Sequence, residues 1–382
     1  MGARCRDSLR VTRRQRFQPG WRTAGFVLLI LGACGCLAAA DRGDAGTRIV
    51  VAGGQFQVDG RRIWINGANT PWQHWNDFGG AFDPAWWDAH FRALHENGIN
   101  ATRVWISCSG DVGIAIAADG MVTGATDAHW RDLDRLFEIA AKHRVYVLAT
   151  VMSFDNFKDN HAHHRQWRSW LGSDRAIDSY VESYLVPLVE RCGRSPWLWA
   201  VDLMNEPDWV YEDAACGRIP WERLQAYFAR AARAIHRHSG VLVTVGSAMP
   251  KYASDTGRGC LSNRLSDRAL RERVDDPEAR LDFYTTHYYD WNGANWGVAP
   301  YLAPSAYGMP DDKPSVLGEI PAHGTAGHTP AQDYEAAFEH GWQGAMAWTS
   351  NGVDTSGDLT QLGPGTRAFR DRHLSLVRPD GG

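Results

Sequence analysis

Short apolar runs and longer amphipathic stretches alternate along the chain from about residue 49. The apolar runs are six to eight residues long and rich in β-branched and aromatic side chains, which is typical of strands buried on both faces. Eight such runs occur, at Ile63–Ala68, Ala101–Ser107, Val145–Val151, Trp197–Met204, Val241–Ser247, Phe283–Tyr289, Ser315–Ile320 and Ala345–Ser350. A pair of short alternating runs before them meets at Asp59-Gly60, which predicts a β-hairpin.

The segments between the strands carry helical periodicity. In the first of them, Asp83 is a suitable N-cap and Gly98 lies just beyond the last periodic position. The predicted helices are Pro84–Asn97, Trp130–His143, Ala176–Cys192, Trp221–His238, Gln332–His340 and Arg367–Leu374.

Repeated strand-then-helix units predict an α/β fold with a parallel sheet. Because no glycine-rich dinucleotide fingerprint follows the first strand, we expect a (β/α)8 TIM barrel and not a doubly wound sheet. No linker divides residues 41–382, so these residues form one predicted domain. The least regular stretches follow strands three to six, at residues 155–172, 209–220, 249–276 and 291–310, and a barrel places them at its active-site mouth.

Residues 1–40 have the composition of an export signal. They hold seven Arg and one Asp, and an apolar run, Ala24–Ala33, that is too short to span a bilayer. Two processing sites compete, because Leu31-Gly32-Ala33-Cys34 resembles a lipobox whose Cys34 would carry a lipid anchor, whereas Ala38-Ala39-Ala40 offers a signal-peptidase site. We therefore expect a protein that is secreted, periplasmic or lipid-anchored at a bacterial cell surface.

Charge and cysteine content narrow the function further. The chain has a net charge of −4; without the basic signal, the body carries −10, which disfavours nucleic acid as a partner. Cys108, Cys192, Cys216 and Cys260 lie in the exported body. Since Cys216 and Cys260 both lie in glycine-containing loops, they are the preferred disulfide pair, and the other two are interpreted as buried thiols.

Two carboxylates end predicted strands. Strand four closes with Asn205-Glu206-Pro207, and strand seven carries Glu319 near its end. Carboxyl ends of barrel strands share one face, so the two glutamates can face one another. Glycoside hydrolysis requires a pair of carboxyl groups that face one another across the scissile bond. The 18 Trp among 382 residues add flat faces on which sugar rings stack.

From about Gly53 to Leu374 the chain resembles glycoside hydrolase family 5, whose members are retaining β-glycosidases with a barrel fold. The resemblance rests on Asn205-Glu206-Pro207, Gly318-Glu319, Arg103 in strand two, His287-Tyr288-Tyr289 in strand six and Trp348 in strand eight. It implies that Glu319 is the nucleophile and Glu206 the acid/base. It also implies that Asn205 binds a sugar 2-hydroxyl and that Trp348 is the platform under the sugar that is attacked.

The chemistry of the side chains expected around Glu319 agrees with the roles that the resemblance implies. Arg103 can keep Glu319 ionised, and Tyr289 can donate a hydrogen bond to the same carboxylate. Period-two alternation places His287 on the side of Tyr289. Asp202 is interpreted as a buried structural acid.

Aromatic and amide side chains near the predicted mouth suit a polymeric sugar. The candidates for substrate binding are Asn69, Trp72, Trp75, Trp105 and Trp291, with Asn76 and Trp296 beside them. β-1,4-Mannan is the preferred substrate, with β-1,4-glucan or an exo-acting β-mannosidase or β-glucosidase as alternatives.

A carbohydrate-binding barrel without catalysis is the alternative from another class. The chain is expected to act as a monomer without a cofactor. The cluster His161, His163 and His164 lacks the partnering ligands of a metal site, so no catalytic metal is predicted.

Overall fold

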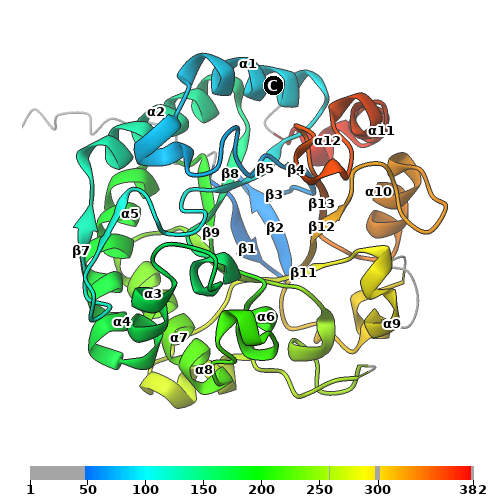
Figure 1. The fold of residues 1–382 in the computed structure, drawn as a ribbon. Coiled ribbons are helices and arrows are strands. Elements are labelled where there is room, and N and C mark those ends of the chain that lie inside the picture. Colours follow the sequence, from blue (N-terminus) through cyan, green and yellow to red (C-terminus); the bar gives the residue numbers. More distant parts are fainter. Residues whose placement is uncertain (1–47, 258, 297–301, 380–382) are drawn as a thin grey trace, which may run out of the picture. The chain divides into compact units, whose positions relative to one another are not determined.

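The computed structural model describes residues 48–257, 259–296 and 302–379, and the predicted export signal lies outside them. Within these residues, eight parallel strands close into a barrel, with helices ranged around it (Figure 1). In order around the ring the strands are β4 (Ile65–Asn69), β5 (Ala101–Trp105), β8 (Tyr146–Thr150), β9 (Leu198–Asn205), β10 (Leu242–Ser247), β11 (Tyr284–His287), β12 (Ser315–Pro321) and β13 (Gly344–Trp348). Every predicted barrel strand is present, so the predicted (β/α)8 fold is confirmed.

The predicted hairpin forms a small antiparallel sheet of β1 (Val50–Ala52), β2 (Gln55–Val58) and β3 (Arg61–Arg62). Asp59 and Gly60, at φ 51° and 73°, form the turn between β2 and β3, as the primed hairpin turns require. Phe56 of β2 packs edge-on against Trp199 and Phe283, with ring centroids 5.3 and 5.2 Å away. Both partners lie at the amino-terminal ends of barrel strands, so the hairpin covers that end of the barrel.

The predicted helices are also present. α1 (Pro84–Glu96) begins at Asp83, whose carboxylate accepts from the backbone N–H of Ala85 and Trp86. The segment predicted as one helix after β8 is α4 (Asp174–Tyr180), a π-helical turn at Val181–Leu185, and α5 (Val186–Arg191). The others are α2 (Asp127–His143), α7 (Trp221–His238), α10 (Pro330–Glu339), and α11 (Leu359–Arg372) with the short α12 (Leu374–Val377).

Helix α11 begins eight residues earlier than the sequence predicts. Gly363, Pro364 and Gly365 are usually helix-breaking residues, yet they lie inside α11. A side chain at Gly363 would lie 2.2 Å from Oδ1 of Asn97, and one at Gly365 would lie 2.8 Å from the backbone N of Ala331. The glycines therefore permit close packing of α11 against neighbouring segments, which outweighs their poor helix propensity.

Several shorter elements occur in segments that the sequence left irregular. They are the hairpin of β6 (Ile114–Ile116) and β7 (Val122–Ala125), and the helices α3 (His164–Gly172), α6 (Pro207–Glu212), α8 (Asp267–Val274) and α9 (Gly293–Trp296). Among the described residues, no helix combines the length and the apolar character needed to cross a bilayer.

The predicted disulfide between Cys216 and Cys260 is wrong, because both residues are free thiols. Cys216 is buried, and its Sγ lies 3.8 Å from the carbonyl oxygen of Phe154. The Sγ of Cys260 lies 3.3 Å from the carbonyl oxygen of Asp255. Each thiol thus contacts a backbone carbonyl oxygen instead of the other sulfur. Cys108 and Cys192 are buried free thiols, as predicted.

Candidate active site

A cavity of about 350 Å³ opens at the carboxyl ends of the barrel strands. Both predicted catalytic glutamates line it, together with aromatic and polar side chains from the ends of several strands and from the loops after them. The lining consists of Trp72, Trp105, Phe154, Asp155, Asn205, Glu206, Tyr289, Trp291, Glu319, Trp348, Asp354 and Ser356.

Glu319 lies within β12, opposite His287 of β11 in the strand register. Its side chain is nearly buried, with 4% of the residue exposed. The guanidinium of Arg103 donates from Nη1 to Oε1 at 2.5 Å, and the hydroxyl of Tyr289 donates to Oε2 at 2.5 Å. Both carboxylate oxygens therefore accept charge-assisted or short hydrogen bonds, as predicted for Arg103 and Tyr289.

Glu206 follows the last residue of β9 and caps α6 with a left-handed backbone, φ 48° and ψ 58°. A non-glycine residue in this region carries strain, which the backbone hydrogen bond from Glu206 N to Gly246 O at 2.7 Å helps to hold. Oε1 lies 2.9 Å from Nδ1 of His287, and Oε2 accepts from the indole N–H of Trp209 at 2.7 Å. Two contacts thus fix the plane of this carboxyl group.

Arg103 connects the floor of the cavity to the barrel interior. Its guanidinium donates to Asp202 through Nε and Nη2, at 3.0 and 2.7 Å, and to Oδ1 of Asn205 at 2.8 Å. Arg103 and Asp202 are both fully buried. This ion pair agrees with the interpretation of Asp202 as a buried structural acid.

Burial dominates the electrostatics of the two glutamates. It raises the pKa of Glu206 to about 7, against the opposing effects of the Trp209 hydrogen bond and the charge of Arg103. Burial also raises the pKa of Glu319, and His287, Arg103 and the Tyr289 hydrogen bond oppose that rise. Since Arg103 contacts only Glu319 of the two, the geometry favours an ionised Glu319 beside a protonated Glu206 near neutral pH.

The pKa values of two side chains next to the glutamates are shifted as well. Burial lowers the pKa of His287 to about 4, so the imidazole is neutral near pH 7. Burial also opposes the charge on Arg103, but Asp202 and Glu319 outweigh it and the pKa of Arg103 is raised. Arg103 is therefore the permanent cation of this cluster.

One ligand atom each from Glu206, His287 and Glu319 lies within 4.8 Å of the others. These donor types suit a metal ion, but Oε1 of Glu319 already binds Arg103 and Oε2 binds Tyr289. An incoming cation would have to displace the guanidinium, so the prediction of a site without metal is retained. The same distance brings the two carboxyl groups into the close range that retaining glycosidases use.

The remaining predicted binding residues fall into two groups. Trp72, Trp105, Trp291 and Trp348 line the cavity together with Asn205. Trp72, Trp105 and Trp348 form one cluster of rings, with centroids 5.1 to 6.1 Å apart, and the guanidinium of Arg103 lies 4.1 Å from the Trp105 centroid.

Four predicted mouth residues, Asn69, Trp75, Asn76 and Trp296, are not part of the cavity lining. Asn69 is fully buried beneath the cavity, where Nδ2 donates to Gly318 O at 2.9 Å and Oδ1 accepts from Arg103 at 3.3 Å. Trp296 is buried against Tyr307 and Trp342, so its predicted place at the mouth is wrong.

Trp75 lies beside the cavity lining, with its ring 4.6 Å from that of Trp72. It stacks on His161, and the two ring planes differ by 14°. His161 and His163 each lie 3.6 Å from a carboxylate oxygen of Asp111. In the described part of the chain, this histidine cluster is not among the groups that could hold a metal.

Three residues close to the glutamates were missed from the sequence. Trp209 stands three residues after Glu206, and the first turn of a helix after Pro207 returns a side chain to that side. The helix α6 was not predicted, so that signal went unused. Asp155 and Asp354 lie in the loops after β8 and β13 and line the cavity, and their sequence context carries no comparable signal.

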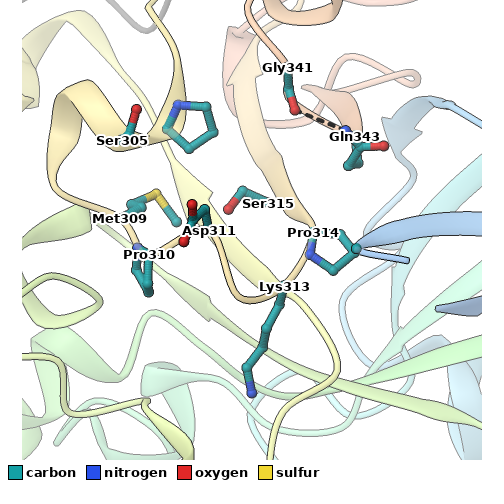
Figure 2. Close-up of a pocket in the computed structure, with 11 residues that line it drawn as sticks. Ser305, Met309, Pro310, Asp311, Lys313, Pro314, Ser315, Gly341 and Gln343 are labelled. Atoms are coloured by element: carbon teal, nitrogen blue, oxygen red, sulfur yellow. Dashed lines mark hydrogen bonds between the residues drawn. The ribbon is translucent and has the colours of Figure 1, made fainter. Parts of the chain in front are cut away.

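A smaller hollow of about 190 Å³ lies at the opposite end of the strands, where β12 begins (Figure 2). Its charged lining residues are Asp311 and Lys313, and in Figure 2 Lys313 points away from the other labelled side chains. The Lys313 ammonium contacts the carboxylate of Asp267 and the carbonyl oxygen of Leu281. No carboxylate pair lines this hollow, so we assign the chemistry to the cavity at the carboxyl ends.

Comparisons with known proteins agree with this assignment. No family model matches the chain. A mannan endo-1,4-beta-mannosidase from Mytilus edulis is 24% identical over 337 residues, which cover 82% of this chain and 90% of the mussel protein. A mannan endo-1,4-beta-mannosidase from Cryptopygus antarcticus is 24% identical over 352 residues, covering 84% and 90%.

A solved structure, the beta-1,4-mannanase of the sea hare Aplysia kurodai, superposes with a TM-score of 0.76 at 26% identity. It covers 85% of this chain and 97% of the sea hare chain. The relatives confirm the resemblance to β-mannanase-like members of glycoside hydrolase family 5 that the motifs indicated.

Proposed function

We propose that this protein is a retaining glycoside hydrolase that cleaves the β-1,4 linkages of mannan. The observation that carries the proposal is the pair Glu206 and Glu319, which lies within 4.8 Å in a cavity lined by aromatic rings, with Arg103 bound to Glu319 alone. Inverting enzymes need a wider gap for a water molecule, about 6.5 to 9.5 Å.

In the first step, Glu319 attacks the anomeric carbon as an ionised nucleophile. Glu206 simultaneously gives its proton to the glycosidic oxygen, so the leaving sugar departs as a neutral alcohol and a glycosyl ester forms on Glu319. In the second step, the Glu206 carboxylate takes a proton from water, and the resulting hydroxide attacks the same carbon. The ester bond breaks, both carboxyl groups return to their starting states, and the configuration is retained.

The surrounding side chains have roles that fit these two steps. Tyr289 and Arg103 hold the plane of the Glu319 carboxylate and stabilise its charge. His287, neutral near pH 7, contacts Glu206 without adding a charge. Asn205 lines the cavity beside Glu206 and is proposed to bind a sugar 2-hydroxyl, while Trp348 is the proposed platform for the sugar under attack.

Mannan is the preferred substrate because both curated relatives are mannan endo-1,4-beta-mannosidases that align with more than four fifths of the chain. Endo action is favoured by the several aromatic rings along the cavity. Trp72 lines the cavity with Trp75 beside it, and Trp291, 65% exposed, lines it as well. Several platforms in a row suit a polymer better than a single sugar.

The test is product release by the purified protein on β-mannan and on soluble β-1,4-glucan, each with the Glu319→Ala variant in parallel. We expect oligosaccharides from mannan, and a loss of at least about 10⁴-fold in the variant. Products from glucan alone would change the substrate. Binding of mannan without products, and unchanged by the substitution, would favour the carbohydrate-binding alternative.

We further propose that the protein is exported, with residues 1–40 removed or with Cys34 lipidated, and that it acts as a monomer. The basic start and short apolar run of the sequence support export. The amino-terminal sequence of the mature protein distinguishes the routes, because it begins at Asp41 after signal-peptidase cleavage and is blocked at Cys34 after lipidation.

A further inference from the structure

Trp209 is bound directly to the proposed acid/base. Its indole N–H donates to Oε2 of Glu206 at 2.7 Å, from the first turn of α6. Trp209 is only half-buried and is not part of the cavity lining. Its contact with Glu206 is therefore made by a side chain outside the cavity lining.

The ring of Trp209 also closes a chain of aromatic contacts between the two carboxylates. Tyr289, bound to Glu319, stacks on Trp291 at 6.0 Å with planes 15° apart. Trp291 in turn packs against Trp209 at 5.9 Å with planes 36° apart. We call Tyr289, Trp291 and Trp209 the aromatic arch, because together they run from Glu319 to Glu206.

The exposed ring of the arch, Trp291, offers a flat face to a bound sugar. A general acid must reach the glycosidic oxygen, so the leaving sugar occupies the Glu206 side of the cavity. Trp291 is 65% exposed, lines the cavity and packs against the ring that holds Glu206, so we place the leaving sugar against it. A sugar stacked on Trp291 would restrict the motion of Trp291 and hence of Trp209.

We propose that Trp209 is a positioning residue that orients Glu206 for proton donation and couples this orientation to occupancy of Trp291 by the leaving sugar. The inference rests on the proposed glycosidase function. Trp209 does not touch the reacting atoms. It acts by fixing the carboxyl plane and by stabilising the carboxylate that appears when the proton leaves.

The indole N–H has a separate electrostatic consequence. A donor to a carboxylate favours the ionised form, and the Trp209 hydrogen bond lowers the pKa of Glu206 against the larger effect of burial. Loss of that donor should raise the pKa of Glu206 and move the alkaline limb of activity to higher pH. None of the substitutions proposed below replaces any of the other groups that face Glu206, which are His287, Tyr289, Arg103, Glu319, Asp155, Lys158 and Asp208.

The experiment compares Trp209→Phe with the matched control Trp291→Phe. Both variants lose an indole N–H and keep an aromatic ring, but only Trp209 donates to Glu206. The pH dependence of kcat/KM is measured on a mannooligosaccharide and on an aryl β-mannobioside whose phenolic leaving group needs little acid assistance. We expect Trp209→Phe to lose about tenfold to a hundredfold on the oligosaccharide, and much less on the aryl substrate.

The two variants should also differ in their pH profiles. Trp209→Phe should shift the alkaline limb upward, whereas Trp291→Phe should keep it and raise KM for the oligosaccharide. Trp209→Gln, which returns an N–H donor, should move the limb back toward the parent enzyme. In a double-mutant cycle, the loss caused by Trp291→Ala should be smaller in the Trp209→Phe background than in the parent.

Equal losses on both substrates with an unchanged alkaline limb would overturn the positioning role, and additive losses in the cycle would overturn the coupling. The parent enzyme separates these failures from failure of the proposed function. If the parent releases no product from mannan or from the aryl substrate, the glycosidase assignment fails. If the parent is active and the Trp209→Phe profile matches that of Trp291→Phe, only the inference about Trp209 fails.

Discussion

The two ends of the barrel bury different kinds of side chain. At the amino-terminal end, Phe56 of the hairpin packs against Trp199 and Phe283, and all three rings are fully buried. At the carboxyl end, Arg103 and Asp202 are also fully buried, and Glu319 is nearly so. One end thus gains free energy from apolar burial, whereas the other removes charges from water.

Because of this difference, we expect substitutions at one end to change mainly the stability and substitutions at the other end to change mainly the activity. Burial of charges is costly unless each is paired, and here the network pairs Arg103 with two carboxylates. The apolar end repays such costs, because each large buried ring contributes on the order of 2 to 3 kcal/mol. Substitutions at the two ends should therefore have distinct signatures.

After removal of the nucleophile Glu319, the largest expected effect is on turnover, from Glu206→Ala at the carboxyl end. Without its proton donor, the enzyme should hydrolyse mannan about 10³-fold to 10⁴-fold more slowly, because the leaving sugar must then depart as an unprotonated alkoxide. An aryl β-mannobioside with a good leaving group should lose far less. Initial rates on both substrates provide the measurement.

The stability of the same variant completes the comparison. Burial raises the pKa of Glu206 to about 7, so this carboxyl group contributes little favourable free energy to the folded state. Chemical denaturation should show a free energy of unfolding no lower than that of the parent. Equal rate losses on both substrates, or a large loss of stability, would contradict the role of Glu206 as the acid.

The next effect is on stability, from Phe56→Ala at the amino-terminal end. Truncation of this buried ring should lower the free energy of unfolding by about 3 to 5 kcal/mol. Since the substitution lies at the opposite end from the cavity, kcat/KM at a temperature well below the unfolding transition should stay within about twofold of the parent. Urea unfolding and initial rates on mannan test the two halves of this expectation, and a joint loss would show that the ends are not independent.

The sequence predicted the side chains on the barrel strands better than those in the loops. Strand periodicity predicted the barrel, and the carboxyl ends of β9 and β12 then placed Glu206 and Glu319 together, because parallel strands end at one face. Arg103 was predictable because it lies within β5, where a regular ladder fixes the direction of each side chain. Tyr289 lies two residues beyond the end of β11, and the resemblance to family 5 pointed to it.

Side chains outside the ladder were harder to place. Asn69 closes β4, and whether its amide faced the cavity or the interior depended on the carbonyl oxygens of Gly318 and Met346, which lie far away in the sequence. Asp354 has a left-handed backbone, φ 57°, in the loop after β13, so the direction of its side chain does not follow from strand alternation. The free Cys216 and Cys260 show likewise that loop residues cannot be paired from local sequence.

The smallest effect is a pH dependence confined to the carboxyl end. Glu206 must be protonated to act as the acid, and burial raises its pKa to about 7, so kcat/KM should fall by about tenfold per pH unit above that value. On the acidic side, Glu319 must be ionised, and burial raises its pKa as well, so the acid limb should lie above the usual range for a glutamate. The profile should therefore be bell-shaped, with its alkaline limb near neutrality.

The same titration should appear in the folding equilibrium. Unfolding returns Glu206 to its ordinary pKa of 4.5, so between about 4.5 and about 7 the folded state binds the proton more strongly than the unfolded state does. Its contribution to stability is present below that window and is lost as pH rises through it. Urea unfolding measured across this range should show the loss in the parent and in Phe56→Ala, but a smaller loss in Glu206→Ala. An identical pH slope in all three proteins would show that Glu206 has no raised pKa and would remove the electrostatic basis for its role as the acid.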